Sequence, residues 1–161
     1  MAVVELLLPA LPEHVRTARL IVTAVARRAG LDLALVDELR LAVGEACSRA
    51  VGLHRENDLL DRIGIRVSED VAGLSVSVTD RGPPAGPRPA DLSGSFDTPA
   101  ADSDADGAYV DPDVALAVLA GLVDEVDVSP GPDGRGTVVT LTWPLARRAP
   151  GGVRPTAVAR S

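Results

Sequence analysis

The residues of this chain that are best suited to chemistry lie in one predicted helix, from Val36 to His54. Glu45 and Arg49 are four residues apart there, so their side chains stand one helical turn apart and can touch. The residues around them are small, namely Ala42, Gly44, Ala46, Ser48 and Ala50. This face of the helix therefore leaves room for another element or for a flat ligand.

A second carboxylate follows the most regular strand pattern in the chain. Residues 74–79 alternate strictly between apolar and polar, which predicts a half-buried strand. Asp80 comes next and is followed by Arg81 and Gly82. An acid at a strand end before Gly-Pro is also a common turn, so this segment alone does not identify a site.

The segment Glu-Ala-Cys-Ser-Arg-Ala-Val from Glu45 resembles the first nucleotide-binding box of the anti-sigma-factor serine kinases. These are small proteins with the ATPase fold shared by histidine kinases, DNA gyrase and the Hsp90 chaperones. The family pattern is Glu, three residues, Asn, then Ala and a hydrophobic residue. The resemblance implies that Glu45 acts as the general base. Arg49 stands where the family has the Asn that holds magnesium.

Two further segments resemble boxes that contact the nucleotide in this family. Asp80 and Gly82 match the box whose Asp accepts a hydrogen bond from the adenine amino group, although Pro84 replaces its second glycine. The segment before the last strand resembles the closing Gly-Gly-Thr, which implies a nucleotide contact for Thr137. The same segment is equally a plain hairpin turn.

The phosphate-binding box is the least well matched. The apolar helix of residues 114–123 resembles the family's helix and ends in Leu-Val-Asp, as expected. Asp113 and Ala115 occupy the places of the glycines that would hold phosphate. An acid there repels phosphate and also takes up the free amides at the helix start.

Arg49 has two interpretations. It pairs with Glu45 and makes the site structural, or it contacts a nucleotide phosphate directly and supports binding without magnesium. We favour the first, because the phosphate box has degenerated as well. Arginine has no acceptor atom and cannot coordinate a cation, so we predict no metal site. The cofactors implied by the resemblance are ATP or ADP, and the pattern argues against magnesium.

Two other features have plain interpretations. His54 lies one residue after the position of the family's His, and we interpret it as a surface residue at a helix end. Cys47, the single cysteine, lies in the middle of a helix among small apolar residues, which indicates a buried and inert thiol. One cysteine also excludes a disulfide framework and fits a reducing cytosol.

Charge and composition narrow the classes of partner. The chain has a net charge of −7, and residues 144–161 carry four arginines and no acid, which leaves −11 on the rest. An acidic body with three aromatic residues argues against binding of nucleic acid or of an anionic membrane. No apolar stretch approaches the length that spans a membrane, and the first residues make a poor signal peptide. We therefore expect a cytoplasmic protein.

The remaining pattern predicts one domain over residues 1–144. The expected order is strand (3–8), helix (12–28), helix (36–54), strands (63–67 and 74–80), helix (114–123) and strands (125–128 and 137–143). This order favours an α+β fold, a two-layer sandwich with helices on one face of a mixed, mainly antiparallel sheet. Residues 81–112 are expected to form a mobile acidic lid, and residues 145–161 a disordered basic tail.

The expected function is that of a regulatory protein similar to anti-sigma factors. It would act by binding proteins, with weak or lost ATP turnover. The resemblance implies a sigma factor, an anti-sigma antagonist or both as partners, and a homodimer is left open. The alternative is an active ATP-dependent protein serine/threonine kinase that phosphorylates the antagonist. Whether the chain is an enzyme stays open at this point.

Overall fold

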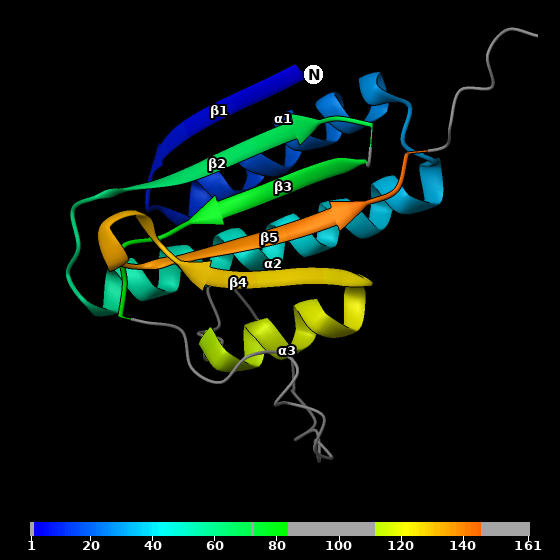
Figure 1. Cartoon of the computed structure of the whole chain (residues 1–161). Helices are drawn as coiled ribbons and strands as arrows, with labels where there is room; N and C mark the ends of the chain where they lie inside the picture. The colour runs from blue at the N-terminus through cyan, green and yellow to red at the C-terminus, as the bar shows by residue number, and fades with distance from the viewer. Residues whose placement is uncertain (1, 72, 84–111, 146–161) are drawn as a thin grey trace, which may run out of the picture.

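The computed structural model describes residues 2–71, 73–83 and 112–145, with only the backbone described at residues 112 and 113. Within these residues, five strands form one sheet, and the helices α1 and α2 cover one of its faces (Figure 1). The elements are β1 (Ala2–Pro9), α1 (Pro12–Ala29), α2 (Leu33–Glu56), β2 (Arg62–Glu69), β3 (Leu74–Thr79), α3 (Pro112–Leu122), β4 (Glu125–Pro130), a 3-10 turn η2 (Pro132–Gly134) and β5 (Thr137–Trp143). The predicted order of elements is confirmed.

The strand order in the sheet is β1-β2-β3-β5-β4, and each pair of neighbours is antiparallel. The α+β sandwich is therefore confirmed, with an antiparallel rather than a mixed sheet across the described strands. The face that α1 and α2 leave uncovered is rich in hydroxyl groups. The Ser77 and Thr140 hydroxyls, for example, lie 3.0 Å apart across β3 and β5.

The helices are bounded by ordinary capping groups. Helix α2 begins three residues earlier than predicted, because the Asp32 carboxylate accepts a hydrogen bond from the Ala34 backbone N–H at 2.9 Å. Helix α1 ends at Ala29, and Gly30, which caps it, has φ 84°. A short connection joins α1 to α2, so the two helices lie antiparallel to each other on the sheet (Figure 1).

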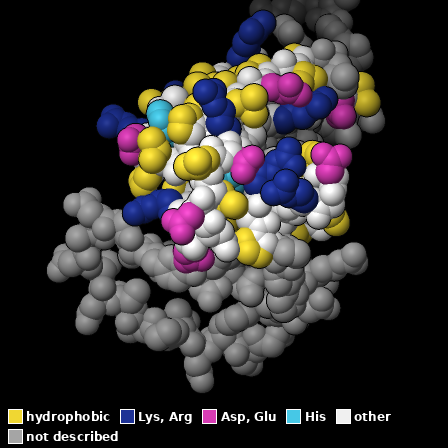
Figure 2. All heavy atoms as spheres, turned by 90° about the vertical axis from the view of Figure 1, so that its left-hand side faces the viewer, with side chains coloured by type: hydrophobic (Ala, Val, Ile, Leu, Met, Phe, Trp, Pro, Cys, Tyr) yellow, Lys and Arg dark blue, Asp and Glu magenta, His cyan; other side chains and the backbone are white. Residues whose placement is uncertain are grey.

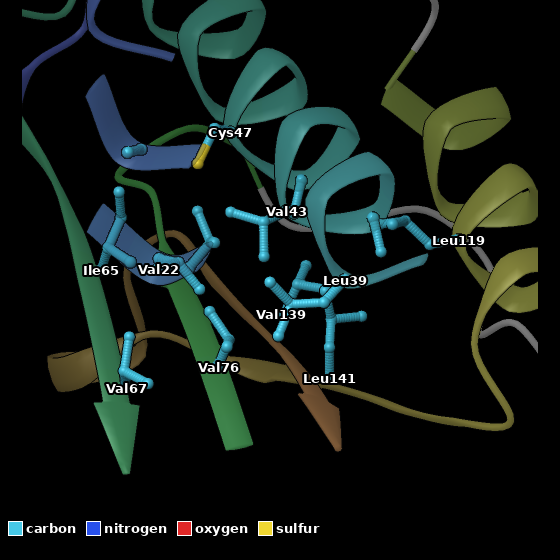
Figure 3. Close-up of a cluster of buried hydrophobic side chains, with 14 of the residues drawn as sticks. Val22, Leu39, Val43, Cys47, Ile65, Val67, Val76, Leu119, Val139 and Leu141 are labelled. Atoms are coloured by element: carbon cyan, nitrogen blue, oxygen red, sulfur yellow. The ribbon is translucent and has the colours of Figure 1, made fainter. Parts of the chain in front are cut away.

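The core lies between the sheet and the two long helices and is aliphatic (Figure 3). Helix α2 contributes an apolar stripe to it, together with Cys47; the buried residues of the stripe are Val36, Leu39, Val43, Ala46 and Ala50. Burial raises the pKa of the Cys47 thiol to about 12, while the nearby Arg19 guanidinium lowers it to a smaller extent. The thiol is therefore neutral at physiological pH, as expected for an inert cysteine.

Parts of two predictions lie outside the described residues. The structure does not describe residues 84–111 of the expected lid. It also does not describe residues 146–161 of the expected tail. None of the described helices combines the length and the apolar character that crossing a membrane requires.

Candidate functional site

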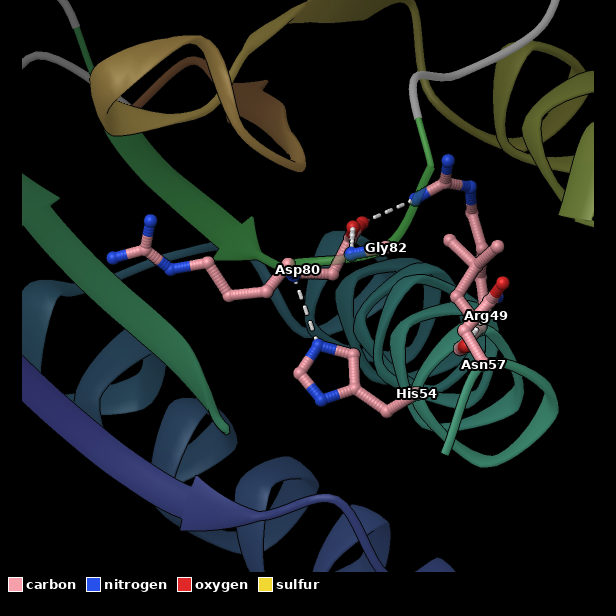
Figure 4. Close-up of polar contacts among 7 residues, drawn as sticks. Arg49, His54, Asn57, Asp80 and Gly82 are labelled. Carbon is pink, nitrogen blue, oxygen red and sulfur yellow. Dashed lines mark hydrogen bonds and ion pairs between the residues drawn. The ribbon is translucent and has the colours of Figure 1, made fainter. Parts of the chain in front are cut away.

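The candidate site lies where β3 ends against the C-terminal half of α2. Asp80 is the first residue after β3, and its backbone N–H donates to the Thr137 carbonyl at 3.0 Å, which ties it to the start of β5. Its side chain points away from the strand towards α2 (Figure 4). The carboxylate is 1% exposed, so its charge requires partners within the protein.

Arg49 of α2 is the main partner of this carboxylate. Its Nη1 lies 2.7 Å from Asp80 Oδ2, and both side chains are 1% exposed (Figure 4). The favoured prediction, in which Arg49 pairs with Glu45, is wrong: no hydrogen bond or ion pair joins these two described residues. The long arginine side chain instead extends from the helix to the end of β3, to a residue 31 positions further along the chain.

The ion pair between Arg49 and Asp80 is costly to open. Burying two charges carries a desolvation penalty that their mutual attraction must offset, and removing one partner leaves the other uncompensated at a cost of about 3–5 kcal/mol. The pair is also not fully satisfied, because Arg49 Nε is buried without a hydrogen-bond partner among the described residues. Asp80 is thus the hydrogen-bond partner of the Arg49 guanidinium among the described residues.

The second carboxylate oxygen of Asp80 is occupied by its own turn. Asp80 Oδ1 accepts a hydrogen bond from the Gly82 backbone N–H at 2.9 Å. A Cβ atom at position 82 would lie 3.0 Å from Leu53 Cβ and 3.3 Å from Asp80 Oδ1. The turn therefore needs glycine for space, because it packs directly against α2.

The hairpin before β5 closes another side of the site. Gly136 has φ 72°, and a Cβ atom there would lie 1.8 Å from the Asp80 carbonyl oxygen. Only glycine permits this approach and this backbone conformation. Thr137 follows it and is 2% exposed. The structure thus brings Arg49, Asp80, Gly82 and Thr137 together at one end of the sheet.

His54 is part of this site, and its prediction as a surface residue is wrong. The side chain is 1% exposed, and its Nε2 accepts a hydrogen bond from the Arg81 backbone N–H at 2.9 Å. Its Nδ1 lies 3.1 Å from the Asp61 carbonyl oxygen, so a neutral ring with the proton on Nδ1 satisfies both contacts. His54 therefore fixes the backbone next to Asp80. Nothing in the helical spacing alone distinguishes this role from that of an exposed helix end.

Glu45, the candidate base, stands apart from these contacts. It lies one turn before Arg49, is half-buried, and forms no hydrogen bond or ion pair with another described residue. The described residues contain no group of three or more His, Cys, Asp or Glu side chains that could hold a metal ion.

The residues present do not fit the cofactors of the resemblance in this arrangement. Both oxygens of Asp80 already accept hydrogen bonds and the side chain is 1% exposed, so an adenine amino group has no open approach to this carboxylate in the arrangement described. Arg49 supplies only donors at the position where a magnesium ligand is required.

The surface at this end of the molecule is mixed in charge. Figure 2 shows that arginine side chains gather near the centre of this face and that acidic side chains lie on both sides of them. The chain contains no lysine, so every basic residue here is arginine.

Comparison with known proteins places the chain in a family. The model of the histidine kinase-like ATPase domain matches residues 8–143. The chain is 37% identical over 82 residues to the serine-protein kinase RsbW of Oceanobacillus iheyensis, which covers 49% of this chain and 50% of the relative. It is 35% identical over 79 residues to the serine-protein kinase RsbW of Bacillus subtilis, which covers 49% of each. The chain thus spans about half the length of the curated relatives that it matches.

The family match runs from the end of β1 to the last residue of β5 and therefore includes the whole described site. The order of the elements and the antiparallel sheet agree with it. The chain belongs to the histidine kinase-like ATPase domain family.

Proposed function

We propose that this chain is a regulatory protein of the anti-sigma-factor type that acts by binding partner proteins, with weak or lost turnover of ATP. The observation that carries the proposal is the buried ion pair between Arg49 and Asp80. It engages the carboxylate that, by resemblance, would bind adenine. By the same resemblance, Arg49 stands at the sequence position of the residue that holds magnesium in the family.

The ion pair lowers nucleotide affinity for a simple energetic reason. A nucleotide that uses Asp80 must first separate the two charges, at a cost of about 3–5 kcal/mol. Each 1.4 kcal/mol weakens binding tenfold, so affinity falls by a factor of about 10²–10⁴. Phosphoryl transfer further requires metal ions to neutralise the phosphates, and Arg49 cannot hold one.

The proposed partners are a sigma factor, an anti-sigma antagonist or both. Support comes from the likeness to two proteins named serine-protein kinase RsbW and from the retained fold. We propose the cytoplasm as the location, where such partners act, and the buried, neutral Cys47 fits a reducing compartment. ATP or ADP is retained as a weak ligand at most, and magnesium is not required for partner binding.

The proposal is tested by measuring transfer and binding on the same samples. The purified chain is incubated with magnesium, ATP labelled on its γ-phosphate, and each small single-domain antagonist encoded in the source genome. Complex formation with these antagonists and with each sigma factor is followed by sedimentation. We expect a stable complex with at least one of these proteins and no labelled antagonist. Labelled antagonist at a rate typical of protein kinases, about 1–100 per second, would contradict the proposal.

The second candidate function is an active protein serine kinase. It is favoured by Glu45, which is half-buried and forms no polar contact with another described residue, so its carboxylate remains available as a base. In this candidate Arg49 leaves Asp80 and contacts phosphate. Asp80 and Gly82 then bind adenine, and Thr137 lies against the adenine ring. The replacement Glu45→Gln separates the two candidates, because it abolishes transfer by a kinase and leaves complexes with partner proteins intact.

A further inference from the structure

We propose that residues 146–161 fold back onto the sheet of their own chain, where arginines of this segment pair with two acids of β4. The surface involved is the face of the sheet that α1 and α2 leave uncovered (Figure 1). Within the described residues no helix packs on this face, because the helices contribute to the core on the opposite side. The uncovered face is therefore the part of the sheet that another segment can reach.

Strand β4 presents two acids on the uncovered face. Glu125 lies opposite Thr142 of β5, and Asp127 lies opposite Thr140. Both threonines are on the uncovered face, because Leu141 between them is buried against the helices. Both acids are exposed, and within the described part of the chain neither side chain forms a hydrogen bond or an ion pair. Their two charges are therefore unbalanced by any described neighbour.

The acid at the opposite edge of the same face is already neutralised. Glu5 of β1 lies opposite Arg66 of β2, and Glu5 Oε1 is 3.1 Å from Arg66 Nη1. Around β4 no cation is close in sequence, because residues 114–134 contain four acids and no Arg, Lys or His. The acids of β4 therefore gain more than Glu5 from a cation that another segment supplies.

A basic segment begins next to these acids. Strand β5 ends at Trp143, beside the start of β4, since Thr142 and Glu125 are paired (Figure 1). The last described residue is Leu145, and residues 146–161 follow it. This segment has no acid and carries four positive charges, those of Arg147, Arg148, Arg154 and Arg160. Its charge is therefore complementary to that of the acids beside which it begins.

The distance that the segment must span is short. Arg147 follows Thr142 by five residues, and extended backbone of that length spans at most about 17 Å. Neighbouring strands are only about 4.8 Å apart, so Arg147 and Arg148 reach Glu125 and Asp127 if the chain turns back over β5. A short tether also keeps the local concentration of the arginines at about the millimolar level. Exposed ion pairs that are individually weak can then act together.

Other acids at this end of the sheet are less available. Glu69 of β2 lies opposite Leu74, whose side chain is buried, so Glu69 belongs to the helix side of the sheet. The Asp70 carboxylate accepts a hydrogen bond from the Gly73 backbone N–H at 3.2 Å. Residues 146–161 are also attached beside β4, whereas a second copy or a basic partner must first associate. These observations favour β4 as the surface and the chain's own segment as its occupant.

The proposal is tested with a nitroxide spin label on the full-length chain. The label is attached at Ala157→Cys, in the basic segment, and broadens the amide signals of residues that lie near it. Cys47 does not react with the labelling reagent, because its thiol is buried and has a raised pKa of about 12. We expect the amides of residues 125–129 to be broadened in the wild-type sequence.

Charge reversal shows whether ion pairs hold the segment in place. One variant combines Glu125→Arg with Asp127→Arg, and a second combines Arg147→Glu with Arg148→Glu. We expect each to reduce the broadening of the β4 amides about twofold or more, because like charges then face each other. The fourfold variant again sets opposite charges against each other, so it should restore the broadening. We also expect a reduction in about 1 M salt, where the Debye length falls to about 3 Å.

The control combines Glu13→Arg and Glu56→Arg, two exposed acids near the far ends of α1 and α2. It changes the net charge as much as the reversal on β4 and should leave the broadening unchanged. All replaced acids are exposed, so the variants are expected to fold, which circular dichroism checks. If the reversal on β4 prevents folding, the reversal at Arg147 and Arg148 still tests the proposal, because it lies beyond the last strand.

Several results would overturn the proposal. These are the absence of broadening at β4, equal broadening in the wild type and both reversals, and a fourfold variant that restores nothing. A mixture of isotope-labelled chain without nitroxide and nitroxide-labelled chain without isotope detects contacts between molecules. Broadening of β4 in that mixture would assign the contact to the segment of a second copy and would also overturn the proposal. None of these measurements involves the ion pair between Arg49 and Asp80, so they are independent of the proposed function.

Discussion

The two ends of α2 are both tied to the sheet by a polar contact, but the contacts differ in kind. Near the start of the helix, the Trp143 indole N–H donates to Glu38 Oε1 at 2.8 Å, at the end of β5. Near its end, Arg49 pairs with Asp80 at 2.7 Å, at the end of β3. The first contact has one charged group and the second has two, both fully buried.

The two contacts therefore have different consequences: the first only holds the helix on the sheet, and the second also blocks the candidate nucleotide site. The bond between Glu38 and Trp143 fixes how the helix lies on the sheet and involves none of the residues that the family resemblance implies for nucleotide binding. The pair between Arg49 and Asp80 also fixes the helix, but it occupies the carboxylate that the resemblance assigns to adenine. Changes at either end should therefore lower stability, but only changes at the Arg49 end should alter nucleotide binding.

The largest expected effect is from breaking the buried ion pair. Asp80→Asn leaves the Arg49 charge buried and unpaired, so we expect the free energy of unfolding to fall by about 3–5 kcal/mol in a denaturant titration. A double variant, Arg49→Met with Asp80→Asn, should recover most of this loss because it removes both charges. A loss below about 1 kcal/mol in the single variant would mean that the pair is solvated.

A smaller effect is expected at the other end of the helix. Glu38→Ala leaves the buried Trp143 N–H without its acceptor, so we expect a loss of about 1–3 kcal/mol in the same titration. Trp143 is the only tryptophan, and its fluorescence reports the change directly. An unchanged stability and emission spectrum for Glu38→Ala would show that this contact does not anchor the helix.

The smallest effect on stability at neutral pH is expected from replacing Cys47, which lies in α2 between the two contacts. Its pKa of about 12 in the folded chain exceeds the ordinary value of 9.0, so the stability it contributes is complete below about pH 9 and is lost as the pH rises towards 12. Compared with Cys47→Ala, the wild type should lose about 1–2 kcal/mol of unfolding free energy between pH 8 and pH 10.5. The same loss in both proteins would contradict the burial of the thiol.

The sequence was sufficient to predict the elements of the fold. Alternation in residues 74–79 and 137–143 and the three- and four-residue steps in α2 each reflect burial on one side of an element. The ends of elements were less well predicted, because they depend on single capping groups. The N-terminal end of α2 is an example, since Asp32 caps it and the helix begins at Leu33, three residues before the predicted start.

The sequence predicted which residues lie at the site, but not which of them contact one another. Helical spacing showed that Arg49 can reach Glu45, and nothing in the sequence showed that the fold brings Asp80, at the end of β3, within reach of the same side chain. The burial of His54 was missed for the same reason, because its partners come from the loop before β2 and from the segment after β3. Local patterns do not report contacts between distant segments.

The most direct test of the closed site is a calorimetric titration with ATP, with and without magnesium, of the wild type and Arg49→Asn. Glu38→Gln serves as the control, because it alters the other end of α2. We predict no measurable heat for the wild type and the control at millimolar ATP, and magnesium-dependent binding for Arg49→Asn, which frees Asp80 and restores an oxygen ligand. Tight binding of ATP by the wild type would contradict the claim that Arg49 closes this site.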